Sequence, residues 1–260
     1  MAALQVDQVG MTFALEKGSI KALEGVSLGL ASGAFGTIIG PSGCGKSTLL
    51  RLVADITQPT SGHITLAGAP PQSARLARRI GFVFQEATLL PWKTVMENVA
   101  LPLTVARRAP IASRHPQELI ELVGLKGFEQ ALPSQLSGGM QQRVAIARSL
   151  VLDPHILLLD EPFGALDDIT RQRMNLELLR IWAETGTTAL MVTHSLSEAV
   201  FMSDKVFVMS PRPGRITAEL AIDLPRPRSQ AMMKLPAFTD AINMLRDQLF
   251  APDASAELVA

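Results

Sequence analysis

Hydrophobic residues gather in short runs along the chain, and several of these runs are apolar throughout instead of alternating with polar residues. The runs are FGTIIG at 35–40, IGFVFQ at 80–85, HILLLDEP at 155–162, TTALMVTH at 187–194 and KVFVMS at 205–210. Continuous apolar runs of this length are typical of strands covered on both faces, as in a parallel sheet flanked by helices. The pattern therefore predicts an α/β protein.

Helical periodicity occupies the stretches between these runs. It follows the first run in KSTLLRLVADI and precedes the fourth in DITRQRMNLELLRIWAET. From 86 to 152 the strand pattern is absent, and three helical segments replace it: VMENVALPLTVARR, RHPQELIELVGL and GGMQQRVAIARSLVL. We therefore predict a helical subdomain at 86–152, inserted into an α/β core formed by 1–85 and 153–225, and a short helical tail at 226–260 that contains FTDAINMLRDQLF.

Composition narrows the class of protein without identifying it. The chain has 260 residues, of which 47% are hydrophobic, and its 24 basic and 24 acidic residues cancel. A balanced charge disfavours a nucleic-acid partner. The first residues lack a secretory signal pattern, and no apolar stretch approaches the roughly 20 residues that span a bilayer, so we predict a soluble, cytosolic chain. Cys44 is the only cysteine, which excludes an internal disulfide and a thiolate metal cluster.

A glycine-rich segment between the first apolar strand and the first helix carries the clearest chemistry. GPSGCGKS matches the P-loop pattern and stands where that loop has to stand. Its amides can cradle a β-phosphate, Lys46 can place a positive charge over the β- and γ-phosphates, and the Ser47 hydroxyl can bind Mg²⁺. A plain glycine-rich turn is the alternative. The expected nucleotide-binding residues are Gly40, Pro41, Ser42, Gly43, Cys44, Gly45, Lys46, Ser47 and Thr48.

Two acids end the apolar strand ILLLDEP. The first of them, Asp160, is placed to hold magnesium, as the strand-end acid of a P-loop NTPase does. Glu161 would face the attacking water, which a carboxylate can deprotonate. Solvated acids at a strand end are the alternative, and the P-loop makes that alternative the weaker one.

A second glycine pair lies far from the P-loop, in SQLSGGMQQR at 134–143. Ser137, Gly138 and Gly139 precede a helical pattern, so they could present a hydroxyl, amides and a helix N-terminus to an anion. Glycines that merely end a loop would leave Ser137 and the following Gln-Gln-Arg unexplained.

Taken together, these motifs resemble the ATP-binding subunits of ABC transporters over residues 4 to 220. LSGGM at 136–140 is similar to the signature motif of that family, usually LSGGQ, with Met140 in place of glutamine. The resemblance implies a P-loop NTPase core with a mostly parallel sheet, an N-terminal antiparallel β part and an inserted helical subdomain. It also implies that two ATPase subunits, here two copies of one chain, pack head to tail, with each ATP between the P-loop of one and Ser137, Gly138, Gly139 and Met140 of the other.

The resemblance assigns further residues one by one. Gln85 matches a glutamine that reaches magnesium and the attacking water, so the expected Mg²⁺ ligands are Ser47, Gln85 and Asp160. GALD at 164–167 is similar to the loop through which two subunits contact each other. His194 matches the switch histidine at the γ-phosphate and would act with Glu161 and Lys46 in catalysis. Ser195 follows it where aspartate is common.

Two further positions are less typical of the family. The chain has no tyrosine, and Phe13 is the aromatic residue at the expected distance ahead of the P-loop, where its π face could stack on adenine. A phenylalanine of the core is the alternative. Asp55 stands where the family usually has glycine, and the sequence alone gives no functional reason for it.

Two stretches narrow the subfamily. EATLLPWKTVMENV after Gln85 and MSPRPGRI at 209–216 resemble importer ATPases for nitrate, sulfonates and taurine, which also serve some pyrimidine and vitamin precursors. The segment 86–99, with Leu89, Leu90 and Trp92 expected at its surface, would receive a coupling helix of the membrane subunit. The implied partners are two transmembrane permease subunits and an extracytoplasmic solute-binding protein, at the cytoplasmic face of the inner membrane.

Other classes of protein explain less of the sequence. A non-transport ABC ATPase of DNA repair would insert long coiled coils between the P-loop and the signature, and no heptad run is present. An ABC ATPase acting on the ribosome usually carries two cassettes in one chain. A P-loop kinase for a small molecule leaves LSGGM and His194 without a role.

Overall fold

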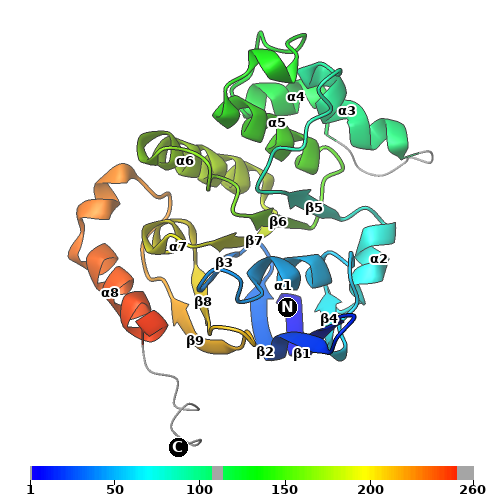
Figure 1. Cartoon of the computed structure of the whole chain (residues 1–260). Coiled ribbons are helices and arrows are strands. Elements are labelled where there is room, and N and C mark those ends of the chain that lie inside the picture. The colour runs from blue at the N-terminus through cyan, green and yellow to red at the C-terminus, as the bar shows by residue number, and fades with distance from the viewer. Residues whose placement is uncertain (1, 107–113, 251–260) are drawn as a thin grey trace, which may run out of the picture. The chain divides into compact units, whose positions relative to one another are not determined.

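The computed structural model describes residues 2–106 and 114–250, and the chain divides into two compact units (Figure 1). Unit 1 comprises Met1–Pro71 and Leu190–Ala260, and unit 2 comprises Gln72–Ala189. Both units contain strands and helices. The α/β class predicted from the apolar runs is therefore confirmed.

Unit 1 contains an antiparallel sheet near the N-terminus. Its strands are β1 (Ala2–Ala14), β2 (Ser19–Ala31) and β4 (Ser61–Leu66), in the order β2-β1-β4. In β1, the side chains of Leu4 and Val6 are fully buried, whereas Gln5 between them is exposed. This alternation is what one covered face of an antiparallel sheet requires. The N-terminal antiparallel part expected from the family resemblance is present.

A second group of strands in unit 1 carries the P-loop. β3 (Phe35–Ile39) runs parallel to β8 (Lys205–Met209), and β9 (Ile216–Ala221) runs antiparallel to β8. All five residues of β3 are buried. The helices of this unit are α1 (Lys46–Val53), α7 (Leu196–Met202) and α8 (Pro236–Phe250), together with a short 3-10 turn at Gln230–Lys234. Helices α7 and α8 pack on each other, and α7 also contacts β3.

Unit 2 combines two parallel strands with a group of packed helices. β5 (Ile80–Val83) is parallel to β6 (Ile156–Asp160), and α3 (Val95–Val105), α4 (Pro116–Leu122) and α5 (Gly138–Leu150) contact one another. The remaining helices are α2 (Pro71–Leu76), α6 (Asp168–Thr185) and a 3-10 turn at Pro133–Gln135. Within the described parts of 86–152 the structure contains helices and turns but no strand. β7 (Thr188–Thr193), buried throughout, spans the sequence boundary between the units.

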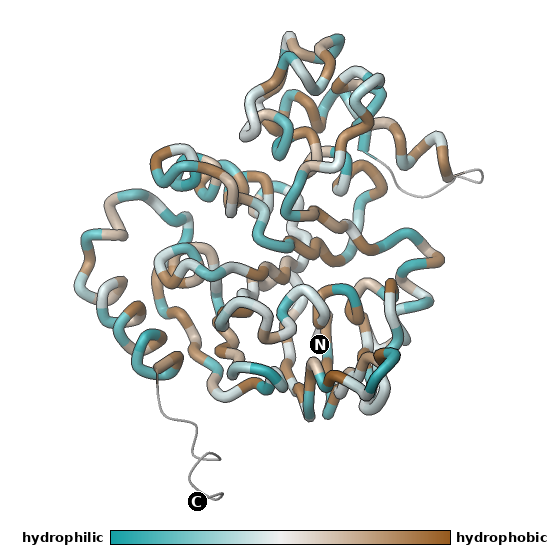
Figure 2. Tube along the Cα trace, viewed as in Figure 1, coloured by the Kyte–Doolittle hydropathy of each residue, from teal (hydrophilic) through white to brown (hydrophobic). Residues whose placement is uncertain are grey.

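The helix ends follow local chemistry. α6 begins and ends at the two residues predicted, because the Asp167 carboxylate accepts a hydrogen bond from Thr170 N at 3.0 Å and Gly186 ends the helix at φ 65°. Figure 2 shows teal and brown residues mixed along α6, and the buried side chains of this helix recur at helical spacing. α4 is shorter than its predicted segment, since His115 caps its start and Gly124 has a φ of 67° just beyond its end. α3 ends at Val105, and the last two residues of its predicted segment lie outside the described part of the chain.

Among the described residues, no helix is both long enough and apolar enough to cross a membrane.

Candidate functional site

The P-loop connects the end of β3 with the start of α1. Gly43 and Gly45 have φ values of 73° and 112°, the left-handed backbone region that glycine enters without strain. The Lys46 ammonium donates to the main-chain oxygens of Gly40 and Pro41, at 2.8 Å each, so its positive charge lies across the loop. Ser47 and Thr48 are half-buried in the first turn of α1. The loop thus has the backbone shape of a phosphate cradle.

Close packing fixes the glycines of this loop. A Cβ on Gly40 would lie 2.7 Å from the Met209 oxygen, and one on Gly45 would lie 2.6 Å from Leu23 Cδ2. Both distances are too short for real contacts. A larger residue at Gly40 would press on main-chain atoms, and one at Gly45 would shift Leu23 or the loop and would be strained at a φ of 112°. Pro41, Ser42 and Gly43 form its exposed tip.

Cys44 faces the interior beneath the P-loop and is 1% exposed. Burial raises the pKa of its thiol, and the positive charge of Lys46 opposes that rise only in part. The thiol is therefore protonated at neutral pH and serves as a small packing group.

His194 lies in the turn between β7 and α7, where its side chain is exposed. The Thr193 hydroxyl and the Glu198 carboxylate are hydrogen-bonded within the protein interior, and Ser195 N donates to Thr193 Oγ1 at 3.1 Å. Ser195 also caps α7, because its hydroxyl accepts from Glu198 N at 3.3 Å. An aspartate would cap the same helix equally well, so the serine keeps the local role of the family's common residue.

Phe13 lies near the end of β1, opposite Ile20 of β2, and is 40% exposed. A phenylalanine of the core would be buried. The exposed ring therefore agrees with the expected stacking role better than with the core alternative.

In unit 2, β6 carries the two acids to one end of its sheet. Asp160 is 8% exposed, and the next residue, Glu161, has a φ of 45°. A left-handed backbone at a residue other than glycine is uncommon and is often found at functional sites. A Cβ added to Gly164 would lie 3.5 Å from Glu161 Oε2 and 3.7 Å from Gln85 Nε2. The structure thus brings Gln85 and Glu161, 76 positions apart in the sequence, to the same glycine.

The signature residues form the start of α5. Ser137 is the N-cap, and its hydroxyl accepts from Met140 N at 3.3 Å. Ser137 and Gly138 are exposed, Gly139 is buried and Met140 is half-buried. No acidic residue occupies the first turn, so the helix dipole there has no negative side chain of its own.

The two signature glycines differ from those of the P-loop in their surroundings. The nearest atom to a Cβ on Gly138 would be Leu166 Cδ2 at 3.8 Å, and for Gly139 it would be Thr170 Cγ2 at 3.6 Å. Both are ordinary van der Waals distances, and neither glycine has a positive φ. The described chain therefore gives no packing reason for glycine at these positions.

Polar side chains from α5 hold the segment that follows β5. Gln142, 4% exposed, donates to the Phe84 oxygen at 3.0 Å. Arg148 donates to the oxygens of Ala87 and Thr88 at 2.8 and 2.9 Å, and burial lowers its pKa. Sequence reasoning missed Arg148. A polar residue in the buried stripe of an amphipathic helix is the signal that could have identified it.

Arg171 of α6 holds the GALD loop. Its guanidinium donates to the oxygens of Phe163 and Leu166, at 3.3 and 2.6 Å, and to the Asp168 carboxylate at 2.9 Å. Asp167, the last residue of that loop, is the N-cap of α6, and the hydrogen bonds from Thr170 lower the pKa of its carboxyl. Sequence reasoning missed Arg171 because its partners in Phe163 and Leu166 are main-chain atoms, which leave no motif.

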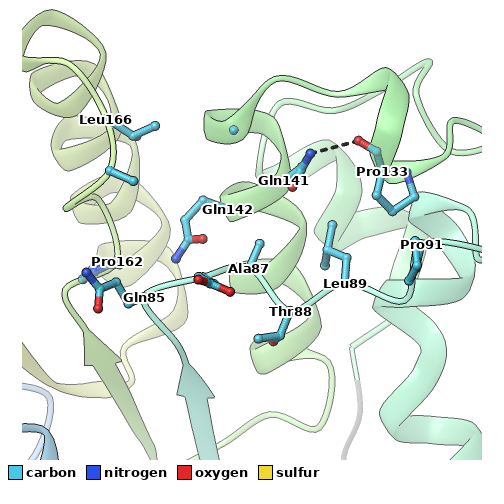
Figure 3. Close-up of a pocket in the computed structure, with 13 residues that line it drawn as sticks. Gln85, Ala87, Thr88, Leu89, Pro91, Pro133, Gln141, Gln142, Pro162 and Leu166 are labelled. Atoms are coloured by element: carbon cyan, nitrogen blue, oxygen red, sulfur yellow. Dashed lines mark hydrogen bonds between the residues drawn. The ribbon is translucent and has the colours of Figure 1, made fainter.

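A cavity of about 490 Å³ in unit 2 adjoins several of these groups (Figure 3). Gln85 and Gln142 line it, as do Leu89, Pro91 and Leu166. Figure 3 shows Gln141 donating to the Pro133 oxygen, at 3.0 Å, on the side of the cavity that also carries Pro91 and Leu89. Of the three residues expected at the surface of 86–99, Trp92 is 71% exposed, whereas Leu89 and Leu90 are half-buried.

Asp55 now has a physical explanation. It follows α1 with a φ of 57°, and Asp55 N donates to the Leu52 oxygen at 3.1 Å. Glycine is the usual residue in this left-handed position after a helix, and aspartate tolerates it better than most residues do. Nothing in the structure explains Met140 in place of glutamine.

Comparisons with known proteins agree with this geometry. Residues 23–164 match the family model of the ABC transporter. The chain is 45% identical over 251 residues to a nitrate import ATP-binding protein of Synechococcus elongatus, covering 93% of this chain and 91% of that protein. It is 43% identical over 257 residues to a taurine import ATP-binding protein of Burkholderia pseudomallei, covering 96% and 97%. A solved dimer of an ATP-binding cassette in a post-hydrolysis state, bound to ADP and phosphate, has a TM-score of 0.73 and 32% identity, covering 85% of this chain and all of that one.

Proposed function

Because this chain belongs to the ABC transporter family, as the ATP-hydrolysing subunit of an importer, we propose that each ATP is held between the P-loop of one copy and the signature residues of a second copy. The contrast between the two glycine groups carries this proposal. A Cβ would meet atoms of the chain at less than 3 Å at Gly40 and Gly45, whereas at Gly138 and Gly139 it would make only ordinary van der Waals contacts. Glycines that no neighbour in the chain requires suit the close approach of a group from outside it.

The phosphate chain of ATP would be bound from two sides. The amides of 40–47 and the Lys46 ammonium would hold the β- and γ-phosphates on one side. The Ser137 hydroxyl and the first amides of α5 would reach the γ-phosphate on the other, where the helix dipole favours negative charge. Phe13 would stack on adenine, and His194 would contact the γ-phosphate. A dimeric cassette among the solved structures supports this arrangement.

Hydrolysis needs a base and an oriented water. Glu161 would accept the proton of a water whose oxygen attacks the γ-phosphorus while the bond to the β,γ-bridging oxygen breaks. Gln85, which lies beside the same glycine as Glu161, would orient that water. Ser47, Gln85 and Asp160 offer only oxygen donors, the ligand type that Mg²⁺ prefers, so this donor set fits the metal. Mg²⁺, when bound, would offset the charge of the phosphates.

The partners follow from the importer assignment. Of the two permease subunits, each would place a coupling helix against the segment 86–99 of one ATPase copy, where Trp92 is exposed and the cavity of Figure 3 is lined by Leu89 and Pro91. An extracytoplasmic solute-binding protein would deliver a small solute, such as nitrate, a sulfonate like taurine, or a pyrimidine or vitamin precursor. The chain would work at the cytoplasmic face of the inner membrane.

We also retain the domain arrangement expected from the sequence. The ATP-binding core would be 1–85 with 153–225, the helical subdomain would be 86–152 and the tail would be 226–260. The packing of α3, α4 and α5 on one another supports a separate helical part.

Replacing Glu161 with glutamine tests the proposed function. The amide keeps the shape of the side chain but cannot take a proton, so ATP hydrolysis by E161Q should fall by about a hundredfold or more. The chain should still bind MgATP and should elute as a dimer in its presence on a sizing column. An exposed acid of unit 2, replaced in E118Q, is the matched control and should hydrolyse ATP at the parent rate. Parent-like hydrolysis by E161Q would show that the base is another group.

A second variant tests the shared site. S137A removes the hydroxyl that is proposed to reach the partner's ATP. It should lose most hydrolysis and nucleotide-dependent dimerisation, while a dilute, monomeric sample binds MgATP as the parent does. If monomeric S137A fails to bind the nucleotide, then Ser137 acts on ATP bound to its own chain.

A further inference from the structure

Arg212 lies in the turn between β8 and β9, and its guanidinium is bonded to the P-loop. Its Nε and Nη2 atoms both donate to the main-chain oxygen of Gly43, at 3.2 and 2.9 Å. The two residues are 169 positions apart in the sequence. The contact therefore ties the exposed tip of the P-loop to a distant segment of the same unit.

The backbone of the P-loop explains why this oxygen needs a donor. A loop that turns successive amides toward a phosphate turns its carbonyl groups away from it. Gly43, at a φ of 73°, belongs to this part of the loop. The Arg212 guanidinium is planar, so the N–H groups of its Nε and Nη2 atoms can both donate to the Gly43 oxygen.

The turn that carries Arg212 is itself held in place. Gly214 N donates to the Ala22 oxygen at 2.9 Å, and Glu24 N donates to the Gly214 oxygen at 3.0 Å. Arg215 forms an ion pair with Glu24, and Ser210 N donates to the Arg215 oxygen at 2.9 Å. The turn 210–215 is thus fastened to β2 and closed on itself, so it can serve as a fixed support.

A second contact joins the same turn to the next residue of the P-loop. A Cβ on Gly214 would lie 2.2 Å from the main-chain oxygen of Cys44. Only glycine permits this approach. The turn 210–215 therefore meets the carbonyl groups of two consecutive P-loop residues, Gly43 through a side chain and Cys44 through backbone packing.

We propose that Arg212 is a positioning residue for nucleotide binding: by holding the Gly43 oxygen outward, it keeps the P-loop amides turned toward the phosphates. This inference rests on the proposed assignment of the P-loop as the ATP site. PRPGR is then more than a connecting turn, because it presets the shape of the cradle before nucleotide arrives. Such presetting lowers the cost of ordering the loop on binding.

Calorimetric titration of the full chain with MgADP tests the proposal, because ADP carries the β-phosphate and is not hydrolysed. R212Q removes the positive charge and the paired N–H donors of the guanidinium. The dissociation constant for MgADP should rise about five- to tenfold, as expected for the loss of hydrogen bonds from a charged donor. R212K keeps a single donor and should recover part of the affinity. R246Q is the matched control, since Arg246 is exposed on α8 and donates to Asn243 Oδ1 of the same helix.

Two further measurements separate the possible outcomes. Without nucleotide, R212Q should unfold at the parent temperature, and the rise in that temperature caused by MgADP should shrink. A nucleotide-free R212Q chain that unfolds well below the parent, or an R212Q chain that binds MgADP like R246Q, overturns the proposal. K46A separates failure of the Arg212 proposal from failure of the proposed ATP site. If K46A loses MgADP binding while R212Q keeps it, only the role of Arg212 is wrong. Parent-like binding of MgADP by K46A would refute the P-loop as the ATP site.

Discussion

The side-chain amide of Gln142 donates a hydrogen bond of 3.0 Å to the main-chain oxygen of Phe84, the residue before Gln85. The signature helix α5 is thereby joined directly to the segment that carries the proposed water-orienting glutamine. Both groups belong to unit 2, and Gln142 is buried. A shift of α5 would therefore move the position of Gln85.

Replacing Gln142 with alanine should test this link. Q142A leaves the Phe84 oxygen without its donor in a part-buried place, so the free energy of unfolding should fall by about 1 to 2 kcal/mol. ATP hydrolysis should fall as well, because Gln85 loses its fixed support. Urea denaturation and an ATPase assay measure the two effects. Q72A, at an exposed glutamine of α2, is the control, and equal stability of the two variants would contradict the prediction.

Gly138 allows function and folding to be separated. G138A adds a methyl group whose nearest neighbour would be 3.8 Å away, at a residue without positive φ. The free energy of unfolding should stay within about 1 kcal/mol of the parent, with alanine favoured in the helix. Hydrolysis should nevertheless drop about a hundredfold, because the methyl group displaces the partner's ATP. An active G138A chain would contradict the proposal that the signature contacts nucleotide.

Asp55 and its neighbour should respond to glycine in opposite directions. D55G places glycine at a φ of 57° and should raise the free energy of unfolding by about 0.5 kcal/mol. A54G places it at a φ of −76°, in a buried helical conformation, and should lower that energy by about 1 kcal/mol or more. Thermal unfolding of both variants checks the signs. A destabilised D55G would show that the hydrogen bond from Gln58 to Asp55 outweighs the backbone strain.

Cys44 should give the protein a specific loss of stability at alkaline pH. Its pKa is raised in the folded chain by burial, so the folded state binds this proton more tightly than the unfolded state does. The resulting stabilisation is complete below the thiol's ordinary pKa of about 8.5 and is lost as pH rises above it. The parent should therefore lose stability faster than C44A between neutral and alkaline pH. Parallel curves for the two chains would contradict the shift.

Much of the core and of the proposed site could be located from the sequence because the relevant physics is local. A strand followed by a glycine-rich loop and a helix defines the phosphate cradle, and Asp167 with Gly186 fixed both ends of α6. The long strands β1 and β2 were expected only through the family resemblance. Their residues alternate between buried and exposed around several register shifts, which break up the periodic signal.

The sequence by itself determined the class of fold and the strand-loop-helix at 35–53, whose glycine-rich loop we propose as the phosphate site, because periodicity and glycine spacing are local features of the chain. Only the tertiary structure decided what holds those residues in place. Arg212 meets Gly43, Gln142 meets Phe84, and Arg171 meets the GALD loop mainly through main-chain oxygens. A main-chain oxygen is the same at every residue, so such contacts leave no mark on the sequence of their acceptor and arise only when the chain folds.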